Sequence, residues 1–542
     1  MLSLSRPSVM AFLACAAWLV SFACGAGTEG WRSAPAPASL PAPPRELRGV
    51  WVASVDNIDW PSRPGLRADE QRAEAERLLD VLAGLNLNAV FLQVRPTSDT
   101  LYPSELEPWS AFLSGRSGAG PQPAYDPLAF WIEAARARAI DVHAWINPYR
   151  ARHPQSIGDD APAHVSKARP ELVREYGPYL WLDPGEPEAE TYILRVVDDL
   201  LRRYPLDGLH IDDYFYPYPR QDPKTKSDVP FPDDASYSAH ANGAPRDQWR
   251  RDNVDRLVQK LQRATRDAAR AAGRTARFTV SPFGIWRPEN PPGIKGMDAV
   301  AKLHADSRRW LRERWADAIV PQLYWPIEQR DQSYPKLLEW WAGERSAASS
   351  NSPTPELWIG LNASRVGPPR DASDRARRWP PEEIVQQIEI ARRAPGVGGH
   401  VLFSARVLAQ NGNGLADVLR ERVYREATLP PEFVPPKDAG QATAEARSSE
   451  LPAPNVRVSS AGEGDPANRT LIVEWNLPGA EASNVRRWVA WLRTDSGWST
   501  RVLPGSERSL ALAASDETKL RAVFIAAVDD AARVHRAGGV AR

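Results

Sequence analysis

Residues 206–217 read LDGLHIDDYFYP, a short apolar stretch followed at once by two carboxylates and a cluster of aromatic side chains. Because Tyr204 and Pro205 end the helical pattern before it, the apolar stretch predicts a brief buried strand. Asp212 and Asp213 then close that strand. Neighbouring like charges cost free energy unless something uses or compensates them, so the stretch indicates a functional site. The alternative is that Asp212 only caps a turn or helix.

On both sides of this strand, short apolar segments alternate with longer amphipathic ones. Strands are predicted at residues 49–55, 88–94, 140–146, 206–212, 277–281, 319–323, 357–361 and 399–403. Helices are predicted at residues 69–84, 127–139, 188–203, 248–272, 300–315, 334–342, 382–393 and 415–424. Eight strand and helix pairs over this length predict an α/β fold, the closed parallel (β/α)8 or TIM barrel.

The whole chain has 542 residues, too long for one ordinary domain. We predict a signal peptide at 1–24, a Pro/Ala-rich linker at 25–46, the barrel at 47–427, a second linker at 428–454 and a last domain at 455–542. That last domain reads as short alternating strands, which predicts a small all-β sandwich. It resembles a fibronectin type III module, with Trp475 in the place of the core tryptophan, and has no obvious catalytic cluster.

Charge and targeting signals limit the partners. Lys+Arg and Asp+Glu both number 68, which argues against nucleic acid or an anionic membrane surface as the main partner. The apolar run Val9–Ala23 indicates export. Two processing routes stay open for this segment: cleavage by an ordinary signal peptidase, or processing at Cys24 with lipidation of that cysteine. Since Cys15 and Cys24 are the only cysteines, the mature domains are predicted to hold no internal disulfide and no cysteine-ligated zinc.

Polar or aromatic residues end every predicted strand. In such a barrel the carboxyl ends of the strands converge on one face, where the active site lies. The strand-end residues are Asp56, Asn57, Gln93, Arg95, Trp145, Asn147, Asp212, Asp213, Ser281, Gln322, Tyr324, Trp325, Asn362 and Ser404. Amide, guanidinium and indole groups suit a polyol, which offers hydroxyls and flat C–H faces. The candidate substrate contacts are Asp56, Gln93, Arg95, Trp145, Asn147, Tyr214, Gln322, Tyr324, Trp325 and Asn362.

Cleavage of a glycosidic bond needs one carboxylate that attacks or activates water and a second carboxyl that protonates the leaving oxygen. Asp212 is the candidate for the first role. Asp213 should point the other way if the strand continues, so it is predicted to bind substrate or to tune the pKa of its neighbour. The acid stays open between Glu107, in LEPWSAFLSG, and Glu289, in FGIWRPEN, and each is as readily explained by a structural role.

Other chemistries find less support. His143 and His210 lie inside predicted strands and are expected to be hydrogen-bonded barrel residues rather than metal ligands. No paired H-x-H, no G-x-S-x-G elbow and no phosphate-binding loop occurs in the sequence. We therefore expect neither a metal nor a cofactor.

Several long motifs resemble the bacterial glycosyl-hydrolase-like family 10. They are RGVWVASVDNIDWPS, NAVFLQVRPTSDTLYPSELEPWSAFLSG, DVHAWINPYR, DGLHIDDYFYPYP, SPFGIWR and PQLYWPIEQRDQSYPKLLEWW, and the resemblance spans about Glu46 to Glu426. It implies an exported barrel enzyme that cleaves glycan on the cell-wall side of the inner membrane. It also implies that the motif aspartates are Asp212 and Asp213. The substrate contacts that it implies are Gln93, Arg95, Trp145, Asn147, Gln322, Tyr324 and Trp325.

The leading hypothesis is a periplasmic or lipid-anchored glycoside hydrolase of the bacterial envelope, acting on polysaccharide, above all peptidoglycan strands without peptides. A glycan-binding protein without turnover is the first alternative, and a polysaccharide deacetylase is the second. No nucleic-acid partner is expected. Contacts with envelope or division proteins through the C-terminal sandwich are a further expectation.

Overall fold

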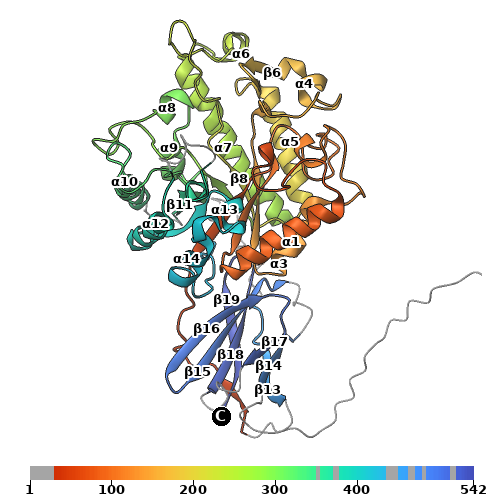
Figure 1. Cartoon of the computed structure of the whole chain (residues 1–542), viewed down its shortest axis with the longest axis vertical. Coiled ribbons are helices and arrows are strands. Elements are labelled where there is room, and N and C mark those ends of the chain that lie inside the picture. The colour runs from red at the N-terminus through yellow and green to blue at the C-terminus, as the bar shows by residue number, and fades with distance from the viewer. Residues whose placement is uncertain are drawn as a thin grey trace, which may run out of the picture.

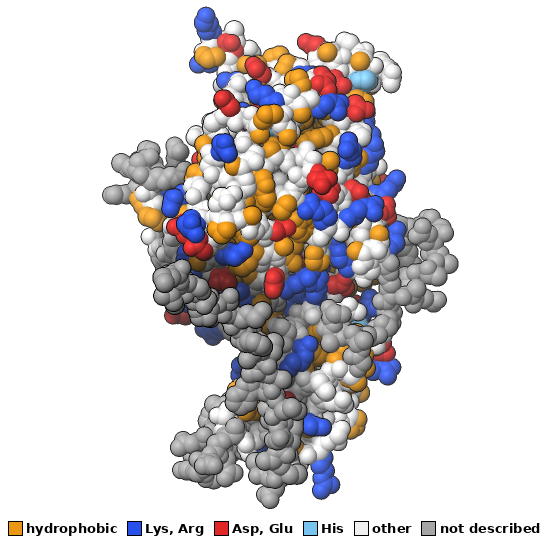
Figure 2. All heavy atoms as spheres, turned by 90° about the vertical axis from the view of Figure 1, so that its right-hand side faces the viewer, with side chains coloured by type: hydrophobic (Ala, Val, Ile, Leu, Met, Phe, Trp, Pro, Cys, Tyr) orange, Lys and Arg blue, Asp and Glu red, His pale blue; other side chains and the backbone are white. Residues whose placement is uncertain are grey.

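The computed structural model describes residues 30–348, 354–369, 378–434, 450–461, 470–478, 484–512 and 520–542. These residues form a barrel surrounded by helices and, below it in Figure 1, a β-sandwich. No helix among them is long and apolar enough to cross a bilayer. On the face shown in Figure 2, basic and acidic side chains are interspersed over the barrel.

Eight parallel strands close the barrel, as the sequence predicts, so the predicted TIM-barrel fold is confirmed. The strands are β2 (Leu47–Val52), β3 (Ala89–Arg95), β4 (Asp141–Ile146), β8 (Gly208–Ile211), β9 (Arg277–Val280), β10 (Ala318–Ile319), β11 (Glu356–Leu361) and β12 (Val397–Leu402). Their order around the barrel is β10-β11-β12-β2-β3-β4-β8-β9. The strand β8 therefore lies between β4 and β9, with Ile211 opposite Ile146 and Val280.

Helices cover the outside of the barrel. They are α1 (Ala68–Gly84), α3 (Pro127–Arg136), α5 (Pro187–Arg203), α7 (Arg246–Ala271), α8 (Ala299–Lys302), α9 (Ser307–Arg312), α10 (Tyr334–Ala347), α12 (Pro381–Arg393) and α14 (Leu415–Arg422). The helix predicted at 300–315 is two short helices instead. His304 has a φ of 52°, which interrupts the helix, and Asp306 caps the second piece by accepting from the Arg309 N–H at 3.2 Å.

Helix α5 shows why these segments pack on the barrel. Its buried residues, Ile193, Val197, Leu200 and Leu201 among them, recur with helical spacing on one face. Glutamates occupy its first turn and arginines its last turn, which complements the helix dipole. The two properties together place one apolar stripe against the sheet and leave the charged side chains outward.

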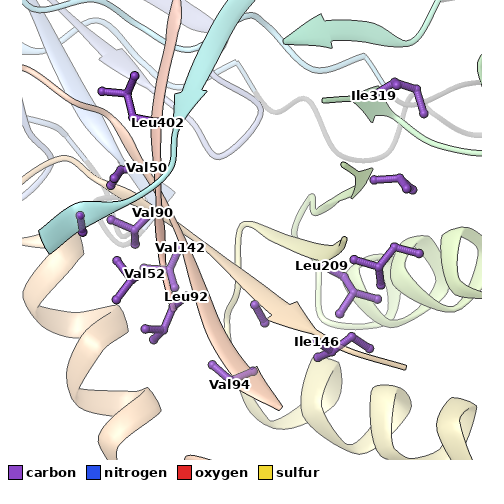
Figure 3. Close-up of a cluster of buried hydrophobic side chains, with 14 of the residues drawn as sticks. Val50, Val52, Val90, Leu92, Val94, Val142, Ile146, Leu209, Ile319 and Leu402 are labelled. Atoms are coloured by element: carbon purple, nitrogen blue, oxygen red, sulfur yellow. The ribbon is translucent and has the colours of Figure 1, made fainter. Parts of the chain in front are cut away.

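The core has two layers because strand residues alternate in direction. Val50, Val52, Val90, Leu92 and Leu209 point from the strands toward the helices (Figure 3). A second cluster fills the barrel interior and contains Trp51, Phe91, Trp145, Ala318, Val320, Trp358 and Val401.

Two histidines share the barrel interior, and the sequence expected both to be hydrogen-bonded. His210 is, since Trp51 Nε1 donates to its Nε2 at 3.0 Å and its Nδ1 lies 2.8 Å from Thr279 Oγ1. His143 is not, because neither ring nitrogen has a partner among the described residues. Burial lowers the pKa of His143 to about 3, so the ring stays neutral and packs against Phe91 at 4.6 Å between centroids.

The loop between β4 and β8 carries a small antiparallel sheet. It contains β5 (Arg150–Arg152), β6 (Val173–Tyr176) and β7 (Tyr179–Leu182), in the order β5-β7-β6, together with α4 (Val165–Ala168). The helix α6 (Asp234–His240) follows β8. In Figure 1 these elements lie at the end of the barrel away from the sandwich, which is the carboxyl end of the strands.

The sandwich packs a five-stranded sheet, β1-β19-β18-β15-β16, against a three-stranded sheet, β13-β14-β17. Its strands are β13 (Asn455–Ala461), β14 (Thr470–Asn476), β15 (Arg487–Thr494), β16 (Gly497–Pro504), β17 (Ser509–Leu512), β18 (Leu520–Val528) and β19 (Val534–Ala541). Trp475 and Trp488 meet in its core at 5.9 Å between centroids. The strand β1 (Arg32–Pro35) comes from the segment expected to be a linker and pairs with β19.

Arg487, the first residue of β15, and Arg486, directly before it, link the sandwich to the amino end of the barrel. Arg487 donates to the carbonyls of Asn88 and Ala139 and pairs with Asp141 at 2.8 Å. Arg486 pairs with Asp207 at 3.2 Å. The partners lie at the beginnings of β3, β4 and β8, so the sandwich covers one end of the barrel and leaves the carboxyl end uncovered.

Candidate active site

Asp212 and Asp213 lie at the carboxyl end of β8, which ends at Ile211. The expectation that Asp213 would point away from Asp212 required the strand to continue. The strand ends at Ile211, so the alternation rule does not extend to these two residues. The two carboxyls accept from different side chains, Asp212 from Trp145 and Asn147 and Asp213 from Tyr218. Burial raises the pKa of the Tyr214 and Tyr324 hydroxyls, and the charges of Asp212 and Asp213 raise both values further.

Asp212 is held by three hydrogen-bond donors. Its Oδ2 accepts from Asn147 Nδ2 at 2.6 Å and from Trp145 Nε1 at 3.2 Å, and its Oδ1 accepts from the Tyr214 N–H at 3.2 Å. Asn147 and Trp145 come from the end of the adjacent strand β4. Burial raises the pKa of Asp212, while the charge of Arg150 and these donors oppose the rise. The carboxylate thus has a fixed orientation.

The pKa of Asp213 is raised as well. Burial raises its pKa to about 7, and the charge of Asp212 adds to this effect. Hydrogen bonds from the Tyr218 hydroxyl and from the Gln322 side chain oppose the rise. Two neighbouring carboxyls with different proton affinities are the arrangement that paired acid and base chemistry requires.

Gln93 is one layer behind the carboxylates rather than a substrate contact. Its side chain is fully buried, its Oε1 accepts from the N–H groups of Ser54 and Val55 at 3.0 Å, and its Nε2 donates to Asn147 Oδ1 at 2.6 Å. Arg150 also donates to Asn147 Oδ1, at 2.8 Å. Because both donors face its oxygen, the Asn147 amide must present its nitrogen to Asp212.

Arg95 and Glu107 bind each other, which contradicts the roles expected for both. The guanidinium pairs with the carboxylate through two contacts, of 2.6 and 2.8 Å, and both side chains are 0% exposed. Tyr192 donates to the same carboxylate at 2.8 Å. A carboxylate that is paired with an arginine and inaccessible cannot reach a substrate, and its arginine has no exposed donor. Glu107 is therefore not the acid, and Arg95 is not a substrate contact.

The structure does not join the other three expected residues to the carboxylate pair. Glu289 is exposed and accepts from the Gly293 N–H at 2.8 Å within its own loop. Asp56 is exposed in a short 3-10 turn, Val55–Asn57, with a φ of 54°. Asn362 accepts from the Ser364 hydroxyl at 2.6 Å. No contact among the described residues links any of them to Asp212 or Asp213.

The expected aromatic and amide residues mostly surround the pair. Hydrogen bonds reach the carboxylates from Trp145, Asn147 and Gln322. The charges of the carboxylates raise the pKa of the Tyr214 and Tyr324 hydroxyls. Trp325 is half-buried one position further along the rim and packs edge-on against Phe283, with ring centroids 5.6 Å apart.

The sequence did not identify three further residues of the rim, Tyr218 and Arg150, which act on the carboxylate pair, and Asp59, which does not contact the pair among the described residues. Tyr218 stands in the aromatic cluster after β8, and its spacing from Asp213 was the available signal. Arg150 follows Asn147 in the motif NPYR. Asp59 accepts from the Ala53 N–H, the Ser404 hydroxyl and the Arg406 N–H, and burial raises its pKa to about 6. It joins the loops after β2 and β12 where the barrel closes.

Within the described ranges, no group of three or more His, Cys, Asp and Glu side chains is placed to hold a metal ion. Cys24 lies outside the described residues.

Comparison with known proteins gives consistent matches. Residues 46–377 match the profile of a family described as Glycosyl hydrolase-like 10. The chain is 38% identical over 398 residues to the Glycosyl hydrolase YngK of Bacillus subtilis (strain 168), covering 72% of this chain and 74% of that protein. It is 32% identical over 429 residues to the Glycosyl hydrolase DigH of Escherichia coli (strain K12), covering 74% of this chain and 93% of that protein. The PgaB (BpsB) glycoside hydrolase domain of Bordetella bronchiseptica superposes with a TM-score of 0.43 at 15% identity. The superposition covers 70% of this chain and 99% of that domain.

Proposed function

The chain belongs to the glycosyl hydrolase-like 10 family and is a glycoside hydrolase, and on that premise we propose that its substrate is a polysaccharide of the bacterial cell envelope. The favoured substrate is the glycan strand of peptidoglycan after its peptides have been removed. One observation carries the proposal: Asp212, fixed by three donors, is followed directly by Asp213, which is buried at the same strand end and accepts from the Tyr218 hydroxyl.

In the proposed mechanism, Asp213 is the general acid. It donates its proton to the glycosidic oxygen as the bond to the anomeric carbon breaks. Asp212, ionised, faces the positive charge that develops at that carbon, and it acts there as nucleophile or as the base that activates water. One water is consumed and its oxygen ends on the anomeric carbon. If Asp212 is the nucleophile, Asp213 takes the proton of that water when the covalent intermediate is hydrolysed; if Asp212 is the base, Asp212 takes it, and exchange with solvent returns a proton to Asp213. This assignment replaces Glu107 and gives Asp213 a role beyond tuning its neighbour.

Asn147, Gln93 and Arg150 are positioning residues in this proposal. They form a hydrogen-bonded series behind Asp212, so its orientation does not depend on substrate. Pre-organised carboxylates avoid reorganisation during the reaction, which is the main way a rigid site lowers a barrier.

We also propose that the protein is exported to the envelope, with residues 1–24 as its signal. The support is the apolar run before Cys24 in the sequence. The mass of the mature amino terminus distinguishes the two processing routes, because lipidation would leave an acylated Cys24 and ordinary cleavage would leave an unmodified residue.

The experiment that tests the substrate is the release of new reducing ends from purified peptide-free glycan strands. We expect release by the wild-type protein and by Asp159→Asn, which changes an exposed carboxylate. Co-sedimentation with the strands without new reducing ends would instead select a glycan-binding protein. Release of acetate without new reducing ends would select a deacetylase.

A further inference from the structure

Six aromatic rings form a continuous series along the carboxyl rim of the barrel, which we call the aromatic track. Its members are Tyr179, Trp181, Tyr214, Tyr218, Phe283 and Trp325. Consecutive ring centroids are 6.1, 6.3, 5.4, 6.4 and 5.6 Å apart in that order. Every ring therefore contacts the next, without a gap from the first member to the last.

The track crosses the carboxylate pair rather than ending at it. Its first two rings belong to β7, in the loop after β4, and its last two follow β9 and β10. Since β4, β8, β9 and β10 are neighbours in the barrel, the track follows a connected arc of the rim. Tyr218, in the middle of the series, donates its hydroxyl proton to Asp213. Aromatic surface thus lies on both sides of the proposed acid.

Five of the six residues of the track are partly accessible, and Trp181 is buried. The hydroxyls of Tyr179 and Tyr214 and the indole N–H of Trp325 make no hydrogen bond within the described residues, and none of them is among the buried unpaired atoms. A half-buried ring with a free polar edge suits a sugar, which combines an apolar C–H face with hydroxyls.

On the opposite arc, half-buried rings also occur, those of Trp109, Trp379 and Phe403 in the loops after β3, β11 and β12, but the strand-end polar groups described there are bound by the protein itself. There the strand-end polar residues pair with one another: Gln93 with Ser54, Arg95 with Glu107, Asp59 with Ser404, and Asn362 with Ser364. Polar groups already satisfied by the protein gain little by binding a ligand. The free polar groups of the track therefore lie on the arc that contains the carboxylate pair, next to an unbroken series of ring contacts.

We infer that the aromatic track binds an extended glycan strand on both sides of the bond to be cleaved, so that the enzyme cuts inside strands rather than removing units from their ends. This inference rests on the proposed function and extends it from a substrate class to a mode of cleavage. A site that held sugars on one side only would instead favour release from a chain end.

The first test follows the lengths of the products when the wild-type protein digests size-fractionated, peptide-free glycan strands. Internal cleavage predicts that the mean strand length falls early, with intermediates of many lengths before disaccharides accumulate. Disaccharides as the sole product from the first time point would overturn the inference and leave the proposed hydrolase function standing. No new reducing ends at all would instead refute the proposed function.

The second test measures binding, so the inference is tested even without turnover. Using Asp213→Asn as background, we expect Tyr179→Ala and Trp325→Ala each to weaken binding of long strands by about 10-fold, which is about 1.4 kcal/mol. Tyr179→Phe should keep most of the affinity because it keeps the ring. Trp498→Ala, a half-buried tryptophan of the sandwich, is the matched control. Unchanged affinity in either alanine variant, with melting temperatures preserved, would overturn the inference.

Discussion

Replacing Tyr218 by phenylalanine should shift the basic limb of the pH profile to higher pH. If Asp213 is the general acid, it must be protonated to act, so activity is lost as pH rises through its pKa of about 7. The Tyr218 hydroxyl donates to the ionised form of Asp213 and therefore lowers this pKa. Removing the donor removes that stabilisation of the charged form.

The size of the shift follows from the hydrogen bond. A bond to an ionised group contributes about 1.5–3 kcal/mol, and one pKa unit corresponds to about 1.4 kcal/mol. Tyr218 is half-buried, so water replaces part of the lost interaction and the lower end applies. We therefore expect the limb to move up by about 1 pH unit.

The assay is the initial rate of reducing-end release from peptide-free strands between about pH 4 and 10, analysed as kcat/KM because that ratio reports the free enzyme. Tyr237→Phe is the control, since it loses a hydroxyl that donates to the Ala244 carbonyl instead of a carboxylate. A basic limb that stays in place or moves to lower pH in Tyr218→Phe would refute Asp213 as the acid.

Three further predictions concern the acid, its support and the domain junction. Asp213→Asn should lower kcat/KM by about 10²–10⁴-fold. The same exchange should raise Tm more at pH 8 than at pH 5. The folded protein holds the proton of Asp213 more tightly than the unfolded protein does, so this carboxyl lowers the folding stability increasingly as pH rises toward 7. Asn147→Ala should lower kcat/KM by about 100-fold with an unchanged fold by circular dichroism, because the carboxylate of Asp212 loses its shortest hydrogen bond. Arg487→Ala should destabilise the protein by about 3–5 kcal/mol in urea unfolding, since Asp141 loses this partner, whereas Arg521→Ala at an exposed pair should leave the unfolding midpoint almost unchanged.

The barrel could be predicted because its strands are buried on both faces. Each strand is then a short apolar run with a polar residue at its end, and the helices between them show helical periodicity. The strand β1 could not be predicted in this way. Its partner, β19, lies at the other end of the chain, and the four residues RSAP carry no strand pattern of their own.

The carboxylate pair could be located from the sequence, but the roles around it could not. A strand-end position indicates that a residue is near the rim, not whether its side chain meets substrate or a neighbouring strand. Gln93 and Arg95 both face other protein groups for this reason. The orientation of Asp213 could not be predicted, because the alternation rule does not extend beyond the end of β8 at Ile211. Its partner Tyr218 approaches from an irregular loop, whose path no periodicity describes.

The most direct measurement compares kcat/KM of the wild-type protein and Asp212→Asn on peptide-free glycan strands, at matched folding by circular dichroism. Because Asp212 is the ionised carboxylate that faces the reacting carbon in this account, the exchange should lower kcat/KM by about 10³-fold or more. An Asp212→Asn protein that kept a tenth of the wild-type value would contradict the assignment of Asp212 and Asp213 as the catalytic pair.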